Sequence, residues 1–142
     1  MQWVRLQLLH QLNMSDKNTT IREIRDWVRE WREKRGWTRR QNSKNFDISL
    51  VLEATELLEH YQWLEGDEVE GDKERKKEVE FELVDILYWV VTLADNYKMD
   101  LSGTLKEKLA KGEKRYPADQ FPKDLPTKEV LKRYYALKKN HD

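Results

Sequence analysis

The sequence predicts an all-α fold, and three observations indicate it. Charged residues make up 38% of the 142 residues, whereas only five are glycine and three are proline, fewer than β domains generally need for turns. Apolar residues recur at helical spacing along most of the chain. The segment from Leu83 to Ala94 is apolar apart from Asp85 and Thr92, which is typical of a buried helix. A chain of this length can form one domain with its own core.

The first predicted helix begins after Thr20 and ends near Arg35. Thr20 is a suitable N-cap because Glu23 follows it at the spacing of a capping box. Apolar residues recur at helical spacing along this segment, and Gly36 supplies the residue type that commonly ends a helix. A polar loop is expected over residues 37–46.

An acidic linker joins the second and third predicted helices. We expect Asn45 or Asp47 to cap the second helix, which then runs to about Leu64. The linker covers residues 66–72, and the third helix, over residues 73–99, is the longest. A linker of this length allows the two helices to pack antiparallel.

Two further helices follow short polar breaks. Ser102 is expected to cap a fourth helix, which Pro117 terminates, and Thr127 is expected to cap a peripheral helix over residues 128–139. Four main helices with short connections predict a four-helix bundle. The second half of the third helix is apolar on nearly all sides, which is more than one edge of a small bundle can bury. We therefore expect a second subunit to cover it.

Composition and charge exclude several classes of protein. The 27 Lys and Arg residues balance 27 Asp and Glu residues, so no basic field attracts nucleic acid and no such partner is expected. The absence of cysteine excludes disulfides and thiolate metal sites, and it fits a cytoplasmic location. The longest apolar run is too short to span a membrane, so no membrane association is expected. Residues 1–19 contain no convincing signal-peptide cleavage site.

Asp85 lies in the most apolar segment of the chain. An ionised carboxylate in an apolar interior is very costly unless it is paired, binds a metal or takes up a proton. Glu82 precedes Asp85 by three residues, and Glu53 and Glu56 form a second pair with the same spacing on the preceding helix. Residues at this spacing share a helix face, so antiparallel packing would bring the two pairs together. Carboxylates without His or Cys suit Mg²⁺, with Mn²⁺ as the alternative, and do not suit Zn²⁺.

Other interpretations of the charged residues stay open. With 27 acidic residues in the chain, a pair such as Glu53 and Glu56 also arises by chance on a solvated helix face. Glu82 and Asp85 could instead form a buried salt bridge with Lys or Arg of the first helix. The basic residues of the fourth helix could contact phosphates, or they could simply complement the helix dipole in solvent.

Five tryptophans, at positions 27, 31, 37, 63 and 89, offer flat surfaces on which a base can stack. Trp27 and Trp31 lie within the first helix, and we interpret them as core residues. Trp37 follows a glycine in the polar loop, and Trp63 ends the second helix beside the acidic linker, so these two are the better ligand candidates. His60 is interpreted as a surface residue.

Four segments together resemble the MazG-like superfamily of all-α nucleoside triphosphate pyrophosphohydrolases, with the dCTP pyrophosphatase branch as the nearest match. They are Glu-Ala-Thr-Glu-Leu-Leu-Glu at 53–59, Tyr-Gln-Trp at 61–63, Glu-Leu-Val-Asp-Ile-Leu at 82–87 and Lys-Arg-Tyr-Pro at 114–117. The resemblance covers roughly residues 20–117. The order of the paired acidic motifs, with Tyr-Gln-Trp behind the first pair, makes it fairly specific.

The resemblance implies an Mg²⁺-dependent nucleotide diphosphatase. Such an enzyme hydrolyses a (d)NTP, with a dCTP-like substrate preferred here, to the monophosphate and pyrophosphate and so cleans the nucleotide pool. Glu53, Glu56, Glu82 and Asp85 match the family's metal ligands, and Glu53 or Glu56 is the predicted catalytic residue that orients or deprotonates the attacking water. The predicted substrate-binding residues are Trp37, Thr38, Arg39, Arg40, Gln41, Asn45, Trp63, Trp89, Lys108, Lys111, Arg115 and Tyr116. The family assembles as dimers or dimers of dimers, with the nucleotide between subunits.

The resemblance also divides the chain and shows where it departs from the family. Residues 1–19 are predicted to be a flexible extension, residues 20–117 the catalytic domain, and residues 118–142 a tail with a short peripheral helix. Gly112 stands where the family often has an Asn, and Val28 stands where the dCTP branch carries a base-contacting His. Alternative functions are a non-catalytic nucleotide-binding scaffold or regulator, or the same fold acting on dUTP or phosphoribosyl-ATP.

Overall fold

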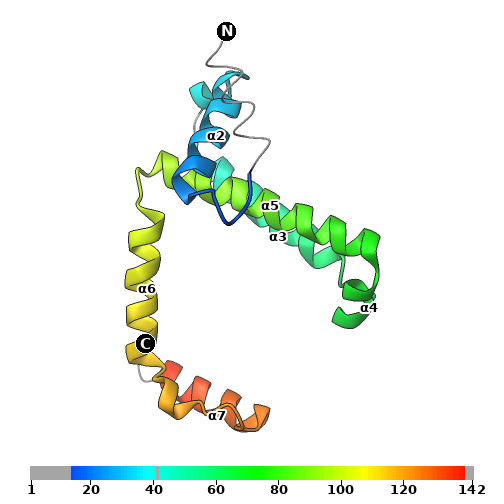
Figure 1. The fold of residues 1–142 in the computed structure, drawn as a ribbon, viewed down its shortest axis with the longest axis vertical. Coiled ribbons are helices and arrows are strands. Elements are labelled where there is room, and N and C mark those ends of the chain that lie inside the picture. Colours follow the sequence, from blue (N-terminus) through cyan, green and yellow to red (C-terminus); the bar gives the residue numbers. More distant parts are fainter. Residues whose placement is uncertain (1–13, 41, 140–142) are drawn as a thin grey trace. The chain divides into compact units, whose positions relative to one another are not determined.

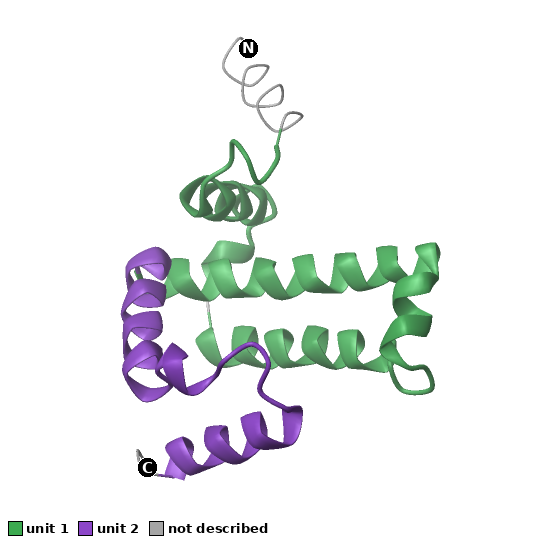
Figure 2. Cartoon of the chain, turned by 60° about the horizontal axis from the view of Figure 1, so that its bottom comes forward, with its two compact units in different colours: residues 1–99 green, residues 100–142 purple. Residues whose placement is uncertain are grey.

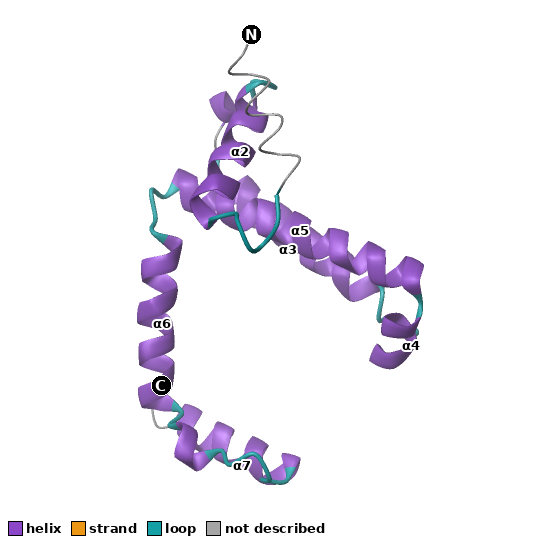
Figure 3. Cartoon of the chain, in the orientation of Figure 1, coloured by secondary structure: helices purple, strands orange, loops and turns teal. Residues whose placement is uncertain are grey.

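The computed structural model describes residues 14–40 and 42–139, and every regular element in these ranges is helical (Figure 3). The prediction of an all-α fold is therefore confirmed. Figure 1 shows the elements along the chain. They are α2 (Ile21–Glu33), the 3₁₀ helix η1 (Trp37–Arg40), α3 (Ser43–Glu59), α4 (Gly66–Gly71), α5 (Lys73–Asn96), α6 (Leu101–Arg115), the 3₁₀ helix η2 (Ala118–Gln120) and α7 (Thr127–Lys139). No described helix is long and apolar enough to cross a membrane.

The chain forms two compact units, which divide between residues 99 and 100 and are coloured separately in Figure 2. In the first unit, α3 and α5 lie side by side and antiparallel, and α4 lies between them in the sequence. Phe46 of α3 contacts Trp89 of α5 with 5.7 Å between ring centroids, and the Asn96 amide donates to the Ser43 hydroxyl at 2.6 Å. The antiparallel packing expected for these helices is therefore present.

Helix α2 packs against α5 through arginines as well as apolar side chains. Arg29 donates to Asp95 at 2.8 Å, and Arg25 donates to the Met99 carbonyl at 3.1 Å. Arg32 is buried, with its guanidinium 4.6 Å from the centre of the Phe46 ring. Cations stacked on aromatic rings stabilise such contacts where water is excluded.

Local sequence signals explain how α2 begins and ends. The Glu23 amide donates to the Thr20 hydroxyl at 3.2 Å, while the Glu23 carboxylate accepts from the Thr20 amide at 2.8 Å. The capping box predicted there is therefore confirmed. Gly36, with φ of +68°, follows the helix in the left-handed conformation that glycine adopts without strain.

The predicted limits of the second helix are wrong at both ends. Its cap is Asn42, whose side chain accepts from the Lys44 amide at 3.1 Å, and neither Asn45 nor Asp47 has this role. The predicted polar loop over residues 37–46 is accordingly shorter, because η1 and the start of α3 take up most of it. The helix ends at Glu59, since the next amides bond to carbonyls three residues back and so tighten the last turn.

Two further predicted boundaries are also wrong. The expected linker over residues 66–72 is mostly the short helix α4, because Glu65 and Glu68 form a capping box at its start. Helix α6 begins after Asp100, whose carboxylate accepts from the Gly103 amide, and Ser102 lies inside the helix. Several polar residues in succession can each act as a cap, and the sequence pattern did not separate them.

The second unit joins α7 to the end of α6. Tyr116 stacks on Tyr134 with 5.1 Å between ring centroids and 16° between planes. Arg115 donates to the Lys138 carbonyl at 2.7 Å, and Arg133 donates to the Gln120 carbonyl at 2.7 Å. The C-terminal helix is therefore held by specific contacts to the Arg-Tyr-Pro segment. The domain limits expected from the resemblance stay predictions.

Candidate active site

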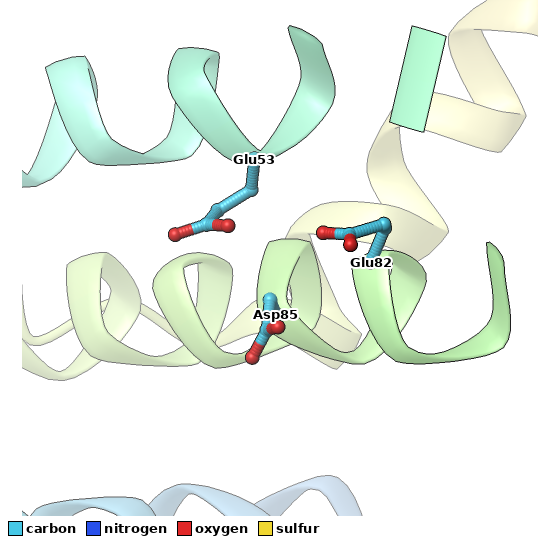
Figure 4. A group of neighbouring side chains, drawn as sticks. All are labelled: Glu53, Glu82 and Asp85. Carbon is cyan, nitrogen blue, oxygen red and sulfur yellow. The ribbon is translucent and has the colours of Figure 1, made fainter. Parts of the chain in front are cut away.

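Three carboxylates from two helices meet on the first unit. Glu53 reaches from α3, Glu82 points toward it from α5, and Asp85 lies one turn further along α5 (Figure 4). Each residue offers one oxygen, and these oxygens all lie within 4.8 Å of one another. We call these three residues the acidic group. Glu53 and Glu82 are half-buried and Asp85 is exposed.

The acidic group has no basic counterpart in the described ranges. None of its members forms an ion pair with Lys or Arg there, so the alternative of a salt bridge to the first helix is not found for Glu82 and Asp85. Glu53 instead accepts from the Trp89 indole nitrogen at 3.1 Å, which orients its side chain. The remaining carboxylate oxygens are therefore available to a cation.

Removal of water and mutual repulsion raise the pKa values of Glu82 and Asp85 in this group. Burial raises the pKa of Glu82, and the negative charges of Glu56 and Asp85 raise it further. Partial removal of water by neighbouring groups raises the pKa of Asp85 even though its side chain is exposed, with a second contribution from Glu53. Like charges this close disfavour ionisation, and a bound cation would reverse that effect.

Two details of the acidic cluster differ from the prediction. The expected burial of Asp85 and of the segment beginning at Leu83 is wrong for the single chain, in which Leu83 is 52% and Val84 58% exposed. In α5, complete burial is confined to residues 91, 92 and 94, near the end against which α2 packs. Glu56 is exposed and lies outside the group of three, although its charge acts on Glu82. Its role as a metal ligand stays a prediction.

An aromatic pocket of about 650 Å³ adjoins the acidic group, and Glu53 and Asp85 form part of its wall. Its aromatic lining consists of Trp27, Trp31, Trp37, Tyr88 and Trp89. Trp31 contacts Trp37 edge to face at 5.1 Å between ring centroids and contacts Tyr88 in the same way at 6.0 Å. A flat aromatic ligand can enter between such rings, because they provide large apolar surfaces in several orientations.

Of the tryptophans predicted to bind the base, only some line the aromatic pocket. Trp37 and Trp89 line the pocket, whereas Trp63 is 85% exposed and does not line the pocket of this single chain. Trp27 and Trp31, which the sequence assigned to the core, also line the pocket. Their spacing of one helical turn, shortly before Trp37, was a usable signal that they share a face with a ligand site.

The remaining predicted contacts from the first unit lie around η1 and the start of α3. Thr38 is half-buried and Arg39 is exposed, both in η1, and Asn45 is exposed in the first turn of α3. Arg40 belongs to η1, and Gln41 lies outside the described residues. Their predicted contacts with substrate stay predictions.

The predicted contacts from the fourth helix belong to the second unit. Lys108 and Lys111 are exposed on α6. Arg115 and Tyr116 are half-buried at its end, where they contact α7 as described above. Phosphate binding by these residues stays a prediction. Val28 and Tyr88 were not predicted as site residues, yet both line the aromatic pocket.

Comparisons with known proteins agree with these features. The MazG-like family model matches residues 48–124. Human dCTP pyrophosphatase 1 is 31% identical over 102 residues, which are 70% of this chain and 60% of the human protein, and the mouse protein of the same name is 32% identical over 69% and 59%. The chain thus spans about 60% of the length of the curated relatives it matches. A crystal structure of a pyrophosphatase from Archaeoglobus fulgidus is 33% identical with a TM-score of 0.63, covering 74% of this chain and 99% of that one. The chain therefore belongs to the MazG-like family.

Proposed function

We propose that this protein hydrolyses a nucleoside triphosphate to the monophosphate and pyrophosphate, with a dCTP-like nucleotide as the preferred substrate. The single observation that carries the proposal is a group of carboxylates that, among the described residues, have no basic partners and adjoin an aromatic pocket. Such a pocket suits a base, and the adjoining carboxylates suit the cation that accompanies a triphosphate. Removal of unwanted nucleotides from the pool is the proposed biological role.

The donor set of the acidic group fits Mg²⁺, with Mn²⁺ as the alternative. Two oxygens bound to one magnesium ion at about 2.1 Å lie at most about 4.2 Å apart, close to the separation within the group. All donors are carboxylate oxygens, as a hard cation requires. We include Glu56 as a fourth ligand because of its charge interaction with Glu82. When bound, the cation would neutralise phosphate charge and activate water.

Side chains of the protein position the water and bind the base and the phosphates. Glu53 or Glu56 orients or deprotonates the attacking water, and the indole of Trp89 holds Glu53 in place at 3.1 Å. Rings of the aromatic pocket hold the base. Arg39 of η1, in the same unit as the pocket, is the proposed phosphate contact. Attack at the α-phosphorus is taken from the family and not from the geometry of these residues.

Self-association is part of the proposal, as a dimer or a dimer of dimers. Several large apolar side chains are exposed on α3 and on α5. They are Ile48, Val51, Leu52 and Leu58 on α3 and Phe81, Leu83 and Val84 on α5. Apolar side chains that a single chain leaves exposed are candidates for an interface, and a second chain would also cover the exposed Trp63. A cytoplasmic location without nucleic-acid or membrane partners remains a prediction.

A nucleotide panel tests the proposed function. The protein is incubated with Mg²⁺ and each dNTP, together with dUTP, phosphoribosyl-ATP and 5-substituted cytosine nucleotides, and pyrophosphate is measured against orthophosphate. We expect pyrophosphate together with the monophosphate. Orthophosphate alone would contradict attack at the α-phosphorus. Absence of product from every nucleotide would favour the non-catalytic scaffold.

A further inference from the structure

Tyr88 lines the aromatic pocket and carries a hydroxyl group to which the proposed function gives no task. Tyr88 follows Asp85 by three residues on α5, so both side chains reach the same side of the helix. Its ring meets Trp31 at 6.0 Å and Trp89 at 5.0 Å, in both cases at 88° between planes. These two edge-to-face contacts fix the ring in the pocket wall.

The Tyr88 hydroxyl makes no hydrogen bond to another residue in the described ranges. Tyr88 is half-buried and its hydroxyl oxygen retains contact with solvent, so a ligand in the pocket could replace water as its partner. Burial raises the pKa of Tyr88, while Arg32 and Arg35 act in the opposite direction. The phenol is therefore protonated at neutral pH and is available as a donor.

The rest of the pocket wall offers few acceptors to a base. The acidic residues Glu53 and Asp85 belong to the acidic group, and Glu53 already accepts from Trp89. Val28 is apolar. Apart from these two carboxylates, the side chains of the wall present indole N–H groups, the Tyr88 hydroxyl and apolar surface, so most of their polar groups can donate to a carbonyl oxygen on the base edge. Cytosine, uracil, thymine and guanine carry such a carbonyl, whereas adenine carries none and offers only ring nitrogens as acceptors.

We propose that Tyr88 is a specificity-determining residue whose phenolic O–H donates to a carbonyl oxygen of the base held in the aromatic pocket. The proposal rests on the proposed function, since it concerns the base of the same nucleotide. It assigns this pocket to nucleotides with a carbonyl-bearing base, and it predicts discrimination against adenine.

Tyr88→Phe tests the proposal, because it removes the hydroxyl and keeps both ring contacts. We measure kcat/KM for dCTP, dUTP and dATP with Mg²⁺. The variant should lose about tenfold with dCTP and dUTP, the effect of one hydrogen bond to a neutral acceptor, and change less than about twofold with dATP. Tyr97→Phe is the matched control, since Tyr97 is 60% exposed and lies outside the pocket.

A binding measurement separates this inference from the proposed function. Dissociation constants of dCMP, dUMP and dAMP are measured with Mg²⁺ by calorimetry, which needs no turnover. Loss of affinity for dCMP and dUMP but not for dAMP in Tyr88→Phe would support the proposal even if no nucleotide were hydrolysed. Equal losses of affinity for all three nucleotides would show that the Tyr88 hydroxyl has only a structural role, and would overturn the proposal. Unchanged affinities in Tyr88→Phe, or failure of the wild type to bind dCMP, would also overturn it.

Discussion

Helix α5 carries acidic side chains along its length, and the fold treats two sets of them in opposite ways. Near its end, Asp95 accepts from Arg29 of α2 at 2.8 Å, and the same arginine also pairs with Asp26. About three turns earlier, Glu82 and Asp85 meet Glu53 of α3, with no Lys or Arg paired to them in the described part of the chain. One site is neutralised by the protein and the other is not.

The difference indicates which acids have a structural role and which await a ligand. A carboxylate paired with arginine contributes to helix packing and needs nothing further. Carboxylates that face one another repel, so they lower the stability of the folded chain until a cation binds. The raised pKa of Glu82, caused by burial and then by Glu56 and Asp85, records this repulsion. Acids of the second kind are the candidates for chemistry.

The largest expected effect is loss of turnover in Glu82→Gln or Asp85→Asn. Each change removes a charged oxygen ligand while keeping the size of the side chain. Loss of even an outer partner of a metal ligand typically lowers affinity or activity by about 10–100-fold, so loss of a ligand should lower kcat/KM by at least about 100-fold. Circular dichroism should show an unchanged helical signal.

Asp95→Asn is the matched control, because it changes an acid of the same helix that is paired with arginine. It should retain turnover per folded molecule and lower the free energy of unfolding by about 1 kcal/mol, since partial exposure screens the pair. The distinction between Asp95 and the acidic group would be wrong if Asp95→Asn abolished turnover, or if Glu82→Gln and Asp85→Asn both kept the wild-type rate.

A smaller effect should appear in the stabilisation by metal. At a Mg²⁺ concentration of about 100 times its dissociation constant, binding adds about 2.7 kcal/mol to the free energy of unfolding. Thermal unfolding with and without Mg²⁺ should show this gain in the wild type and in Asp95→Asn, and much less of it in Glu82→Gln. An equal gain in all three proteins would place the cation elsewhere.

Much of the fold could be predicted from the sequence, because local signals determined it. The capping box at Thr20 and Glu23 and the apolar periodicity located the main helices, and the confirmed all-α fold follows from them. The caps at Asn42 and Asp100 were missed, because neighbouring polar residues offered equivalent side chains. Helix ends depend on which of these side chains reaches a free amide, and spacing alone does not decide this.

The candidate site was predictable only in part. The spacing of Glu82 and Asp85 and the antiparallel helices placed the acids near one another. The aromatic pocket was not predicted, because tryptophans within a helix usually belong to the core. Whether Trp27 and Trp31 face a core or a pocket depends on how α2 lies on α5, which the sequence pattern of one helix does not contain.

The smallest expected effect is the pH dependence of stability without metal. Because the pKa values of Glu82 and Asp85 are raised in the folded state, the folded chain binds more protons than the unfolded chain, and stability falls as pH rises from about 4 through the raised values. With a chelator present, Glu82→Gln should therefore melt at a higher temperature than the wild type at pH 7, and the difference should shrink toward pH 4. Glu59→Gln, on the exposed end of α3, should show no such trend. A difference that stayed constant with pH would mean that repulsion within the acidic group does not distinguish it from the Asp95 pair.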